Sequence, residues 1–342
     1  MSHSRRTLLR GGAGLLAAGA ATSLAGCSGA ANGDADGFDG GYAAFFTLSD
    51  WANEVAGDRA TFENPVEVGR LGHGWTPDGT LAADVAATDA FVYLDSPEFA
   101  WAQDLAATLE ADYDSVAVVD ALADVEDDLL AWDHVHGEAG DEDDHDEQPD
   151  GDEHDEQADG DENRQHDPHV WVDPVFAATM VETIATGLGE ADPDNAAAYA
   201  DNAAAYAEEL DAVDAGFESI ATDAARDVAV IAGHNSFQYL EARYGFRLHS
   251  PIGVSPQNEP SQSQIADTIE LVDEAGIDTI LYDRFESTTL AETIVENSGA
   301  TETMAVTPAG GTTKEWNEAG YGYLEQMTEV NLPAFERAFG VQ

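Results

Sequence analysis

Apolar runs of strand length alternate with helical stretches along this chain, and the alternation occurs in two sets. The first set contains the run 42–48 with the helical stretch after it, then "DAFVYLD" ahead of "PEFAWAQDLAATLEA", and then "DSVAVVDAL". The second set contains "RDVAVIAG" ahead of "SFQYLEARYGF", "GIDTILYDRF" after "PSQSQIADTIELVDEAG", and "TETMAVTP". Such alternation is typical of parallel sheets covered by helices. The sequence therefore predicts an α/β fold of two similar lobes, each a parallel-type sheet flanked by helices, with Ser49 or Asp50 capping the first helix.

One long helix is predicted between the two sets. Apolar residues spaced alternately by four and three form a single stripe over roughly 28 residues, or about 42 Å. The stripe consists of Tyr199, Ala203, Tyr206, Leu210, Val213, Phe217 and Ile220. An ordinary amphipathic surface helix would show the same stripe, but its place between two α/β halves favours a rigid connection. We therefore predict an amino-terminal lobe at 41–188, a linking helix at 189–223 and a carboxy-terminal lobe at 224–342.

The amino-terminal segment has the features of an export signal. Arg5 and Arg6 precede a short apolar run that ends in "LAGC" at Cys27. A paired arginine before such a run is typical of a twin-arginine signal, here 1–26. "LAGC" resembles a lipobox, so we expect a lipidated Cys27 and a flexible tether at 27–40, although a merely accidental cysteine is the alternative. The protein is then exported and anchored to the outer face of the cytoplasmic membrane.

The charge of the chain excludes some partners. Sixty-nine acidic residues against twelve basic ones give a formal net charge of −57. Such a surface repels nucleic acid and anionic lipid headgroups, so we expect no nucleic-acid partner and membrane contact only through the lipid anchor. Because 43% of the residues are hydrophobic, we interpret the charge as adaptation to molar salt, as in halophilic archaea, where the Debye length is about 3 Å, and not as disorder.

Three histidines occupy matching places in this scheme, two after strand-like segments and one just before an apolar helix start. His73 stands in "LGHGWTPD" after the strand-like "VEVG", His169 in "DPHVWVDP", and His234 in "VIAGHNSF" after a buried strand. Ligands bind at the carboxyl ends of parallel strands, and three imidazoles with one oxygen make a common tetrahedral zinc site. A single loop histidine is usually a polar surface residue, which is how we interpret His249. The joint placement of the other three predicts a metal site.

Residues 133–166 form an acidic, low-complexity loop without a hydrophobic period. Its histidines are His134, His136, His145, His154 and His166. A mixture of imidazoles and carboxylates on a flexible chain binds divalent cations loosely. A charge run that only solvates the surface would need no histidines, so we favour auxiliary metal capture.

The ordered motifs resemble those of the solute-binding lipoproteins of zinc and manganese ABC importers. The resemblance covers nearly all of the chain after the signal. It rests on "FFTLSDWANEVAGD", "HGWTPD", the acidic histidine-rich loop with "DPHVWVDP", "HNSFQYLEARYGF" and "NEPSQSQI". It implies two α/β lobes joined by a long rigid helix, with the metal in the cleft between them and His73, His169 and His234 as its ligands. Trp171 and Pro174 then look like packing and helix-start residues.

One position departs from the family pattern. The family usually supplies a fourth ligand from an Asp-Pro step late in the chain, whereas this chain has Thr307 before Pro308. The fourth ligand is then water or Asp283, and we expect Thr307→Asp to restore a carboxylate. Manganese members tend to have a carboxylate at the position of His234, so the resemblance favours Zn²⁺ over Mn²⁺.

The resulting hypothesis is a monomeric, exported, high-affinity zinc-binding protein that delivers the metal to an ABC permease with its ATPase, and not an enzyme. Manganese or another divalent metal is the alternative within this class. A three-histidine zinc hydrolase is the alternative from another class, but the sequence shows no separate base motif such as H-E-x-x-H. A cell-surface adhesion protein is a third alternative.

Overall fold

The computed structural model describes residues 37–131, 166–253 and 259–341. Within these ranges, Phe38–Gln342 belong to one compact unit. The predicted signal 1–26, Cys27 and four loop histidines lie outside the described residues; these are His134, His136, His145 and His154. Among the described residues, no helix is both long and apolar enough to cross a membrane.

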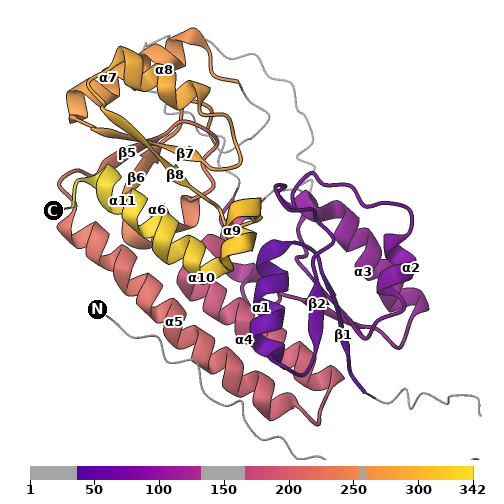
Figure 1. Ribbon diagram of the computed structural model, residues 1–342. Coiled ribbons are helices and arrows are strands. Elements are labelled where there is room, and N and C mark those ends of the chain that lie inside the picture. Colours follow the sequence, from indigo (N-terminus) through magenta and orange to yellow (C-terminus); the bar gives the residue numbers. More distant parts are fainter. Residues whose placement is uncertain (1–36, 132–165, 254–258, 342) are drawn as a thin grey trace, which may run out of the picture. The chain divides into compact units, whose positions relative to one another are not determined.

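The first lobe is built on a four-stranded parallel sheet with the strand order β2-β1-β3-β4. Its strands are β1 (Gly40–Ala43), β2 (Thr61–Glu63), β3 (Ala90–Tyr93) and β4 (Ala117–Asp120). Its helices are α1 (Phe46–Ala56), α2 (Leu81–Val85), the 3-10 turn η1 (Pro97–Phe99), α3 (Ala100–Asp112) and the 3-10 turn η2 (Glu126–Asp128). Figure 1 shows this lobe in indigo and purple.

The second lobe repeats this arrangement, with the parallel strand order β6-β5-β7-β8. Its strands are β5 (Val228–Ile231), β6 (Arg247–His249), β7 (Thr279–Asp283) and β8 (Glu302–Val306). Its helices include α6 (Gln238–Tyr244), α7 (Gln262–Ala275) and α8 (Thr289–Asn297). In each sheet the first strand of the lobe lies second, between the strands that follow it. The prediction of two similar α/β lobes with parallel sheets is therefore confirmed.

The chain passes from the first lobe to the second through η3 (His169–Val172), α4 (Pro174–Ala191) and α5 (Ala196–Asp223). All seven residues of the predicted apolar stripe are buried on α5, which packs against α4, α1 and α11. A Cβ on Gly216 would lie 2.8 Å from Leu332 Cδ1, so the close approach of α5 to α11 requires this glycine. The long helix begins at Ala196 and not at 189, because α4 continues to Ala191.

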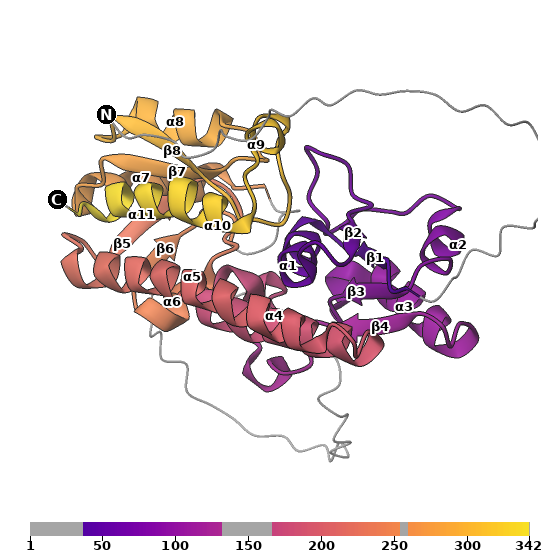
Figure 2. The same ribbon diagram turned by 60° about the horizontal axis from the view of Figure 1, so that its bottom comes forward.

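The carboxy-terminal helices were not anticipated from the sequence. They are α9 (Lys314–Ala319), α10 (Tyr323–Glu325), the π-helix η4 (Gln326–Asn331) and α11 (Leu332–Phe339). In Figure 2, α11 runs along the second sheet, and it contacts β5, β7 and β8 as well as α5. The main hydrophobic core consequently extends from the first sheet along α5 to α11, whereas a smaller cluster lies among β5, β7, α7 and α8.

Three local predictions about the first lobe were wrong. The run 42–48 is not one strand, because α1 already begins at Phe46. Ser49 and Asp50 therefore lie inside α1 and cap nothing: the Ser49 hydroxyl donates to the Phe62 carbonyl (3.1 Å), and the Asp50 carboxylate accepts from the Tyr323 N–H (2.8 Å). The segment "VEVG" is not a strand either. Its Val68 is 50% exposed, and the strand of this region is β2.

Candidate metal centre

Three histidines from different segments meet in one place. His73 lies in the loop after β2, His169 is the first residue of η3, and His234 follows β5. Their ring centroids are 6.1 Å (His73 to His169), 6.1 Å (His73 to His234) and 5.8 Å (His169 to His234) apart. One ring nitrogen of each lies within 4.8 Å of the others. The structure thus brings together the three histidines that the sequence singled out.

Two of these imidazoles carry a buried nitrogen with no hydrogen bond. The Nε2 atoms of His73 and His169 are both buried and have no partner among the described residues. The other nitrogen of His169 is fixed, because Asp167 Oδ1 lies 2.7 Å from its Nδ1 and also accepts the His169 N–H (3.0 Å). Leaving buried polar atoms unpaired costs free energy, and a shared metal ion is the kind of ligand that would pair both.

His234 is held by two neighbours. Its Nδ1 lies 2.5 Å from Glu286 Oε1, and its Nε2 lies 2.7 Å from the Ser236 hydroxyl. A Cβ at position 233 would lie 2.4 Å from Glu286 Oε2, so Gly233 allows the carboxylate to approach. Metal-binding histidines commonly bond a carboxylate through the second nitrogen, which fixes the ring orientation. Asp167 and Glu286 make such a bond to His169 and His234.

The charge states of the site differ from group to group. Burial, together with the charges of His169 and His234, lowers the pKa of His73 to about 3. Burial also acts to lower the pKa of His234, but the hydrogen bond and charge of Glu286 outweigh it and raise that pKa above its usual value. His73 is consequently neutral and ready to bind a metal at any physiological pH, whereas His234 retains a proton more readily.

Two carboxylates lie beside His234. Asp283 is the last residue of β7 and is fully buried; its Oδ1 accepts the Phe285 N–H (2.8 Å), while its Oδ2 has no partner among the described residues. Burial raises the pKa of Asp283 to about 7. His234, Asp283 and Glu286 form a second group whose ligand atoms lie within 4.8 Å of one another. The sequence interpretation missed Glu286, although a carboxylate just past the carboxyl end of a buried strand was a usable signal.

Thr307 has a structural role. Its buried hydroxyl donates to Gln326 Oε1 (3.0 Å) and accepts from the Ala309 N–H (2.9 Å). A carboxylate at this position could not donate to Gln326, so Thr307→Asp would disturb this network whatever it did to the metal. Trp171 donates from Nε1 to the Pro308 carbonyl (2.6 Å), and Pro174 is the first residue of α4. Their predicted packing and helix-start roles are confirmed.

The described ends of the acidic loop lie next to the site. His166 pairs with Ala131 in an isolated antiparallel bridge, and it is exposed. The Tyr239 hydroxyl accepts the Leu130 N–H (3.1 Å) and donates to the Asp167 carbonyl (2.8 Å). The Asp167 carboxylate also bonds His169. The described end of the loop is therefore connected by hydrogen bonds to a candidate metal ligand.

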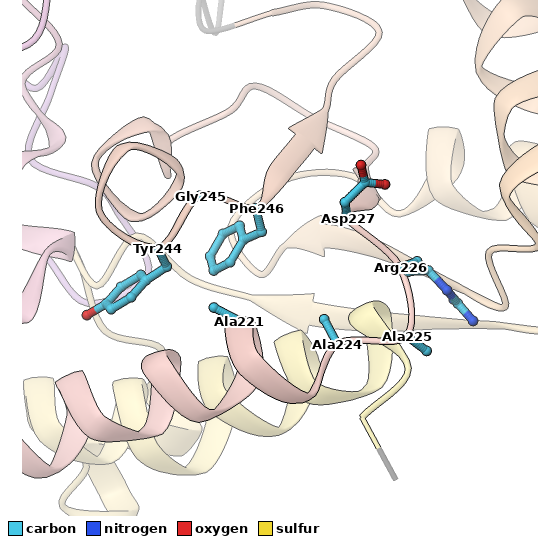
Figure 3. A pocket seen from close by; sticks show the side chains of 8 residues that line it. All are labelled: Ala221, Ala224, Ala225, Arg226, Asp227, Tyr244, Gly245 and Phe246. Carbon is cyan, nitrogen blue, oxygen red and sulfur yellow. The ribbon is translucent and has the colours of Figure 1, made fainter.

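Other features of the described residues lie apart from this site. His249 bonds the Thr268 hydroxyl through Nε2 (2.9 Å) and belongs to neither histidine group. The acidic group of Asp95, Asp120 and Glu126 lies after β3, at the end of β4 and at the start of η2, and Asp120 Oδ1 accepts the N–H groups of Asp95 and Leu122. A cavity of about 380 Å³ lies where α5 ends. Its lining includes alanines, two aromatic side chains, Arg226 and Asp227 (Figure 3), and none of the three histidines.

Comparison with known proteins agrees with the fold. The family model of zinc-uptake complex component A, periplasmic, matches residues 42–338. The chain therefore belongs to this family of metal-uptake binding proteins.

The chain is similar in sequence to named zinc-binding proteins of two bacteria. The zinc-binding lipoprotein AdcA of Streptococcus pneumoniae is 31% identical over 300 residues, which cover 86% of this chain and 54% of AdcA. The high-affinity zinc uptake system protein ZnuA of Bacillus subtilis is 27% identical over 292 residues, which cover 85% of each chain. This chain thus spans about half the length of the AdcA relatives that it matches.

A solved structure has the same fold. The crystal structure of the Zn(II)-bound ZnuA-like domain of S. pneumoniae AdcA aligns with a TM-score of 0.68 and 27% sequence identity. The alignment covers 89% of this chain and 99% of that domain. The chain therefore corresponds to the ZnuA-like part of AdcA.

Proposed function

We propose that this protein binds zinc tightly outside the cytoplasm and delivers it to an ABC importer. The observation that carries the proposal is the meeting of three imidazoles within 4.8 Å, two of them with a buried and unpaired Nε2. The names of the relatives AdcA and ZnuA, and the zinc in the crystal structure of the AdcA domain, support the same metal. The permease, its ATPase and a monomeric state are part of this proposal.

The donor set favours zinc over manganese. Imidazole is a good ligand for zinc, copper and nickel, whereas manganese prefers carboxylate, carbonyl and water oxygens. Three nitrogens with one carboxylate match the four-coordinate tetrahedral geometry of zinc. Relative affinity alone would not exclude copper or nickel. We propose that a buried site limited to four ligands in tetrahedral geometry selects zinc, because copper(II) and nickel(II) favour square-planar or tetragonal geometry.

We further propose that Glu286, and not Asp283 or water, supplies the fourth ligand. Glu286 Oε1 already lies 2.5 Å from His234 Nδ1, and its side chain is 28% exposed, so it would exchange this hydrogen bond for a bond to the metal. Asp283 is fixed by the Phe285 N–H and fully buried, and its raised pKa favours the neutral acid. An extra methylene also gives glutamate the longer reach toward His73 and His169.

The pair Glu286→Gln and Asp283→Asn tests this assignment. Both substitutions keep the shape and remove the charge. Loss of a residue that hydrogen-bonds a metal ligand typically weakens metal binding by about 10–100-fold. We expect Glu286→Gln to weaken zinc binding by more than this, and Asp283→Asn to have a smaller effect. Competition with a zinc chelator measures both affinities. A larger loss for Asp283→Asn would assign the ligand to Asp283, and two small losses would leave the position to water.

Metal titration of the mature chain in high salt tests the function itself. We expect one tight zinc, little competition from manganese, and several weaker zinc ions bound by the loop histidines. Deletion of 134–165 should remove the weak sites and leave the tight one. Loss of the tight site in the deleted chain, or preference for manganese, would contradict the proposal.

The membrane anchor also remains a proposal. Cys27 and the twin-arginine segment lie outside the described residues, and the name "zinc-binding lipoprotein" of the AdcA relative supports lipidation here. Mass spectrometry of the mature amino terminus would detect acyl chains on Cys27, and an unmodified cysteine would contradict the anchor.

A further inference from the structure

The three histidines are not equally supported by their neighbours. Asp167 and Glu286 lie against the Nδ1 atoms of His169 and His234. No described residue bonds Nδ1 of His73, and this atom is not buried, whereas its Nε2 is. Metal-binding histidines almost always donate their second N–H to a carboxylate, a carbonyl or water. His73 therefore needs an acceptor from outside the described residues.

A cavity adjoins His73 on the surface. It has a volume of about 300 Å³, and its lining includes Arg70, His73, Trp75 and Phe285. A water molecule occupies about 30 Å³ of liquid, so the space would hold a small organic acid. Trp75 packs edge-on against Trp101 (5.0 Å between centroids) and Phe285 against Trp316 (6.0 Å). Trp75 and Phe285 thus form two aromatic walls of the cavity beside His73, the candidate zinc ligand.

Arg70 gives this cavity a positive charge that is only weakly paired among the described residues. Its guanidinium is 67% exposed, and the nearest carboxylate, Glu67, lies 3.9 Å away, a separation at which an exposed pair contributes little. The same Glu67 oxygen already accepts the Trp75 Nε1–H (2.9 Å). Arg70 lies three residues from His73 and is one of the twelve basic residues of the chain. Its charge is therefore available to attract an anion into this cavity.

We infer that this cavity binds a small free carboxylate together with the metal. One carboxylate oxygen would accept the His73 Nδ1–H, as Asp167 does for His169, and the charge would pair with Arg70. The carboxylate would complete the support of His73 and strengthen its bond to zinc. The inference rests on the proposed zinc site and adds a second ligand to it, so that zinc and a small organic acid bind cooperatively.

Zinc titrations with and without malonate, at fixed free zinc and constant ionic strength, test this inference. Millimolar malonate is expected to tighten zinc binding by about tenfold. This is the lower end of the effect of a carboxylate that hydrogen-bonds a metal-binding histidine. Malonamide, which has the same size and no charge, should have no effect. Arg70→Gln should abolish the response to malonate while leaving zinc affinity without malonate unchanged. Arg59→Gln, at an exposed arginine that bonds Asn195, is the matched control and should respond as the wild type does.

Each outcome bears on one of the two proposals. No tight zinc binding without malonate would overturn the proposed function. Tight zinc binding with no response to malonate would mean that water accepts the His73 N–H, and it would overturn the carboxylate inference alone. An equal response in the wild type and in Arg70→Gln would also overturn it, because the carboxylate would then act elsewhere.

Discussion

His234→Ala is expected to weaken zinc binding by on the order of 100-fold or more. Zinc sites with four protein ligands contribute about 10–16 kcal/mol, so that one ligand accounts for about 3 kcal/mol. His234 is also the residue shared by the two groups of potential ligands, one with His73 and His169 and the other with Asp283 and Glu286. Its loss would separate the imidazoles of the first lobe from the carboxylates of the second. Chelator competition on the purified chain measures the change.

His249→Ala is the matched control for this experiment. His249 lies at the carboxyl end of β6, next to β5 in the same sheet, but its Nε2 bonds Thr268. We expect wild-type zinc affinity for this variant. Thermal unfolding of both metal-free variants would show whether the fold is retained. If His234→Ala bound zinc as the wild type does, or if both variants lost zinc equally, histidine ligation at this site would be refuted.

The scaffold of the site could be predicted from the sequence because its signals are local. Strand-like runs alternate with helices, and the stripe from Tyr199 to Ile220 falls on one face of one helix. The carboxyl ends of parallel strands meet at one edge, so His234, which follows β5, was correctly placed at such an edge. His73 was placed there because of "VEVG", although the strand that precedes it is β2. That the two edges face one another depends on α5, which packs against α1 and α11, and on the contact of α10 with α1.

The rest depends on contacts that are distant in the sequence. The first turn of α1 follows β1 so closely that Ser49 and Asp50 serve as partners of Phe62 and Tyr323 and not as caps. Glu286 gains its role only because Gly233, 53 positions earlier, leaves room for its carboxylate. The family pattern drew attention to Thr307 instead, and nothing local in the sequence reveals that its hydroxyl is taken by Gln326 and Ala309.

The second large effect concerns pH, and the pKa shifts of the site determine its size. A metal-binding imidazole must be neutral, so zinc competes with protons wherever the metal-free site is protonated. The pKa of His73 is lowered to about 3, mainly by burial, and His73 therefore adds no proton competition above that pH. The pKa of His234 is raised above its usual 6.5, because Glu286 outweighs the effect of burial. Of the three imidazoles, His73 therefore does not contribute to the pH dependence of zinc binding in this range.

Zinc affinity is consequently expected to be constant above the pKa of His234 and to fall by at least tenfold per pH unit below it. The sign follows from the raised pKa: the charged, non-binding form of His234 is favoured as the pH falls. Between pH 6.5 and pH 5 this gives a loss of roughly 30-fold or more. Titrations at several pH values, corrected for the protonation of the competing chelator, measure the slope.

Because burial raises the pKa of Asp283 to about 7, a direct Asp283 ligand would add one further proton and steepen the fall by up to another tenfold per pH unit. Asp283→Asn would then restore the shallower slope. A slope of three protons would show that His73 titrates with the others, and a constant affinity down to pH 5 would contradict binding through His234.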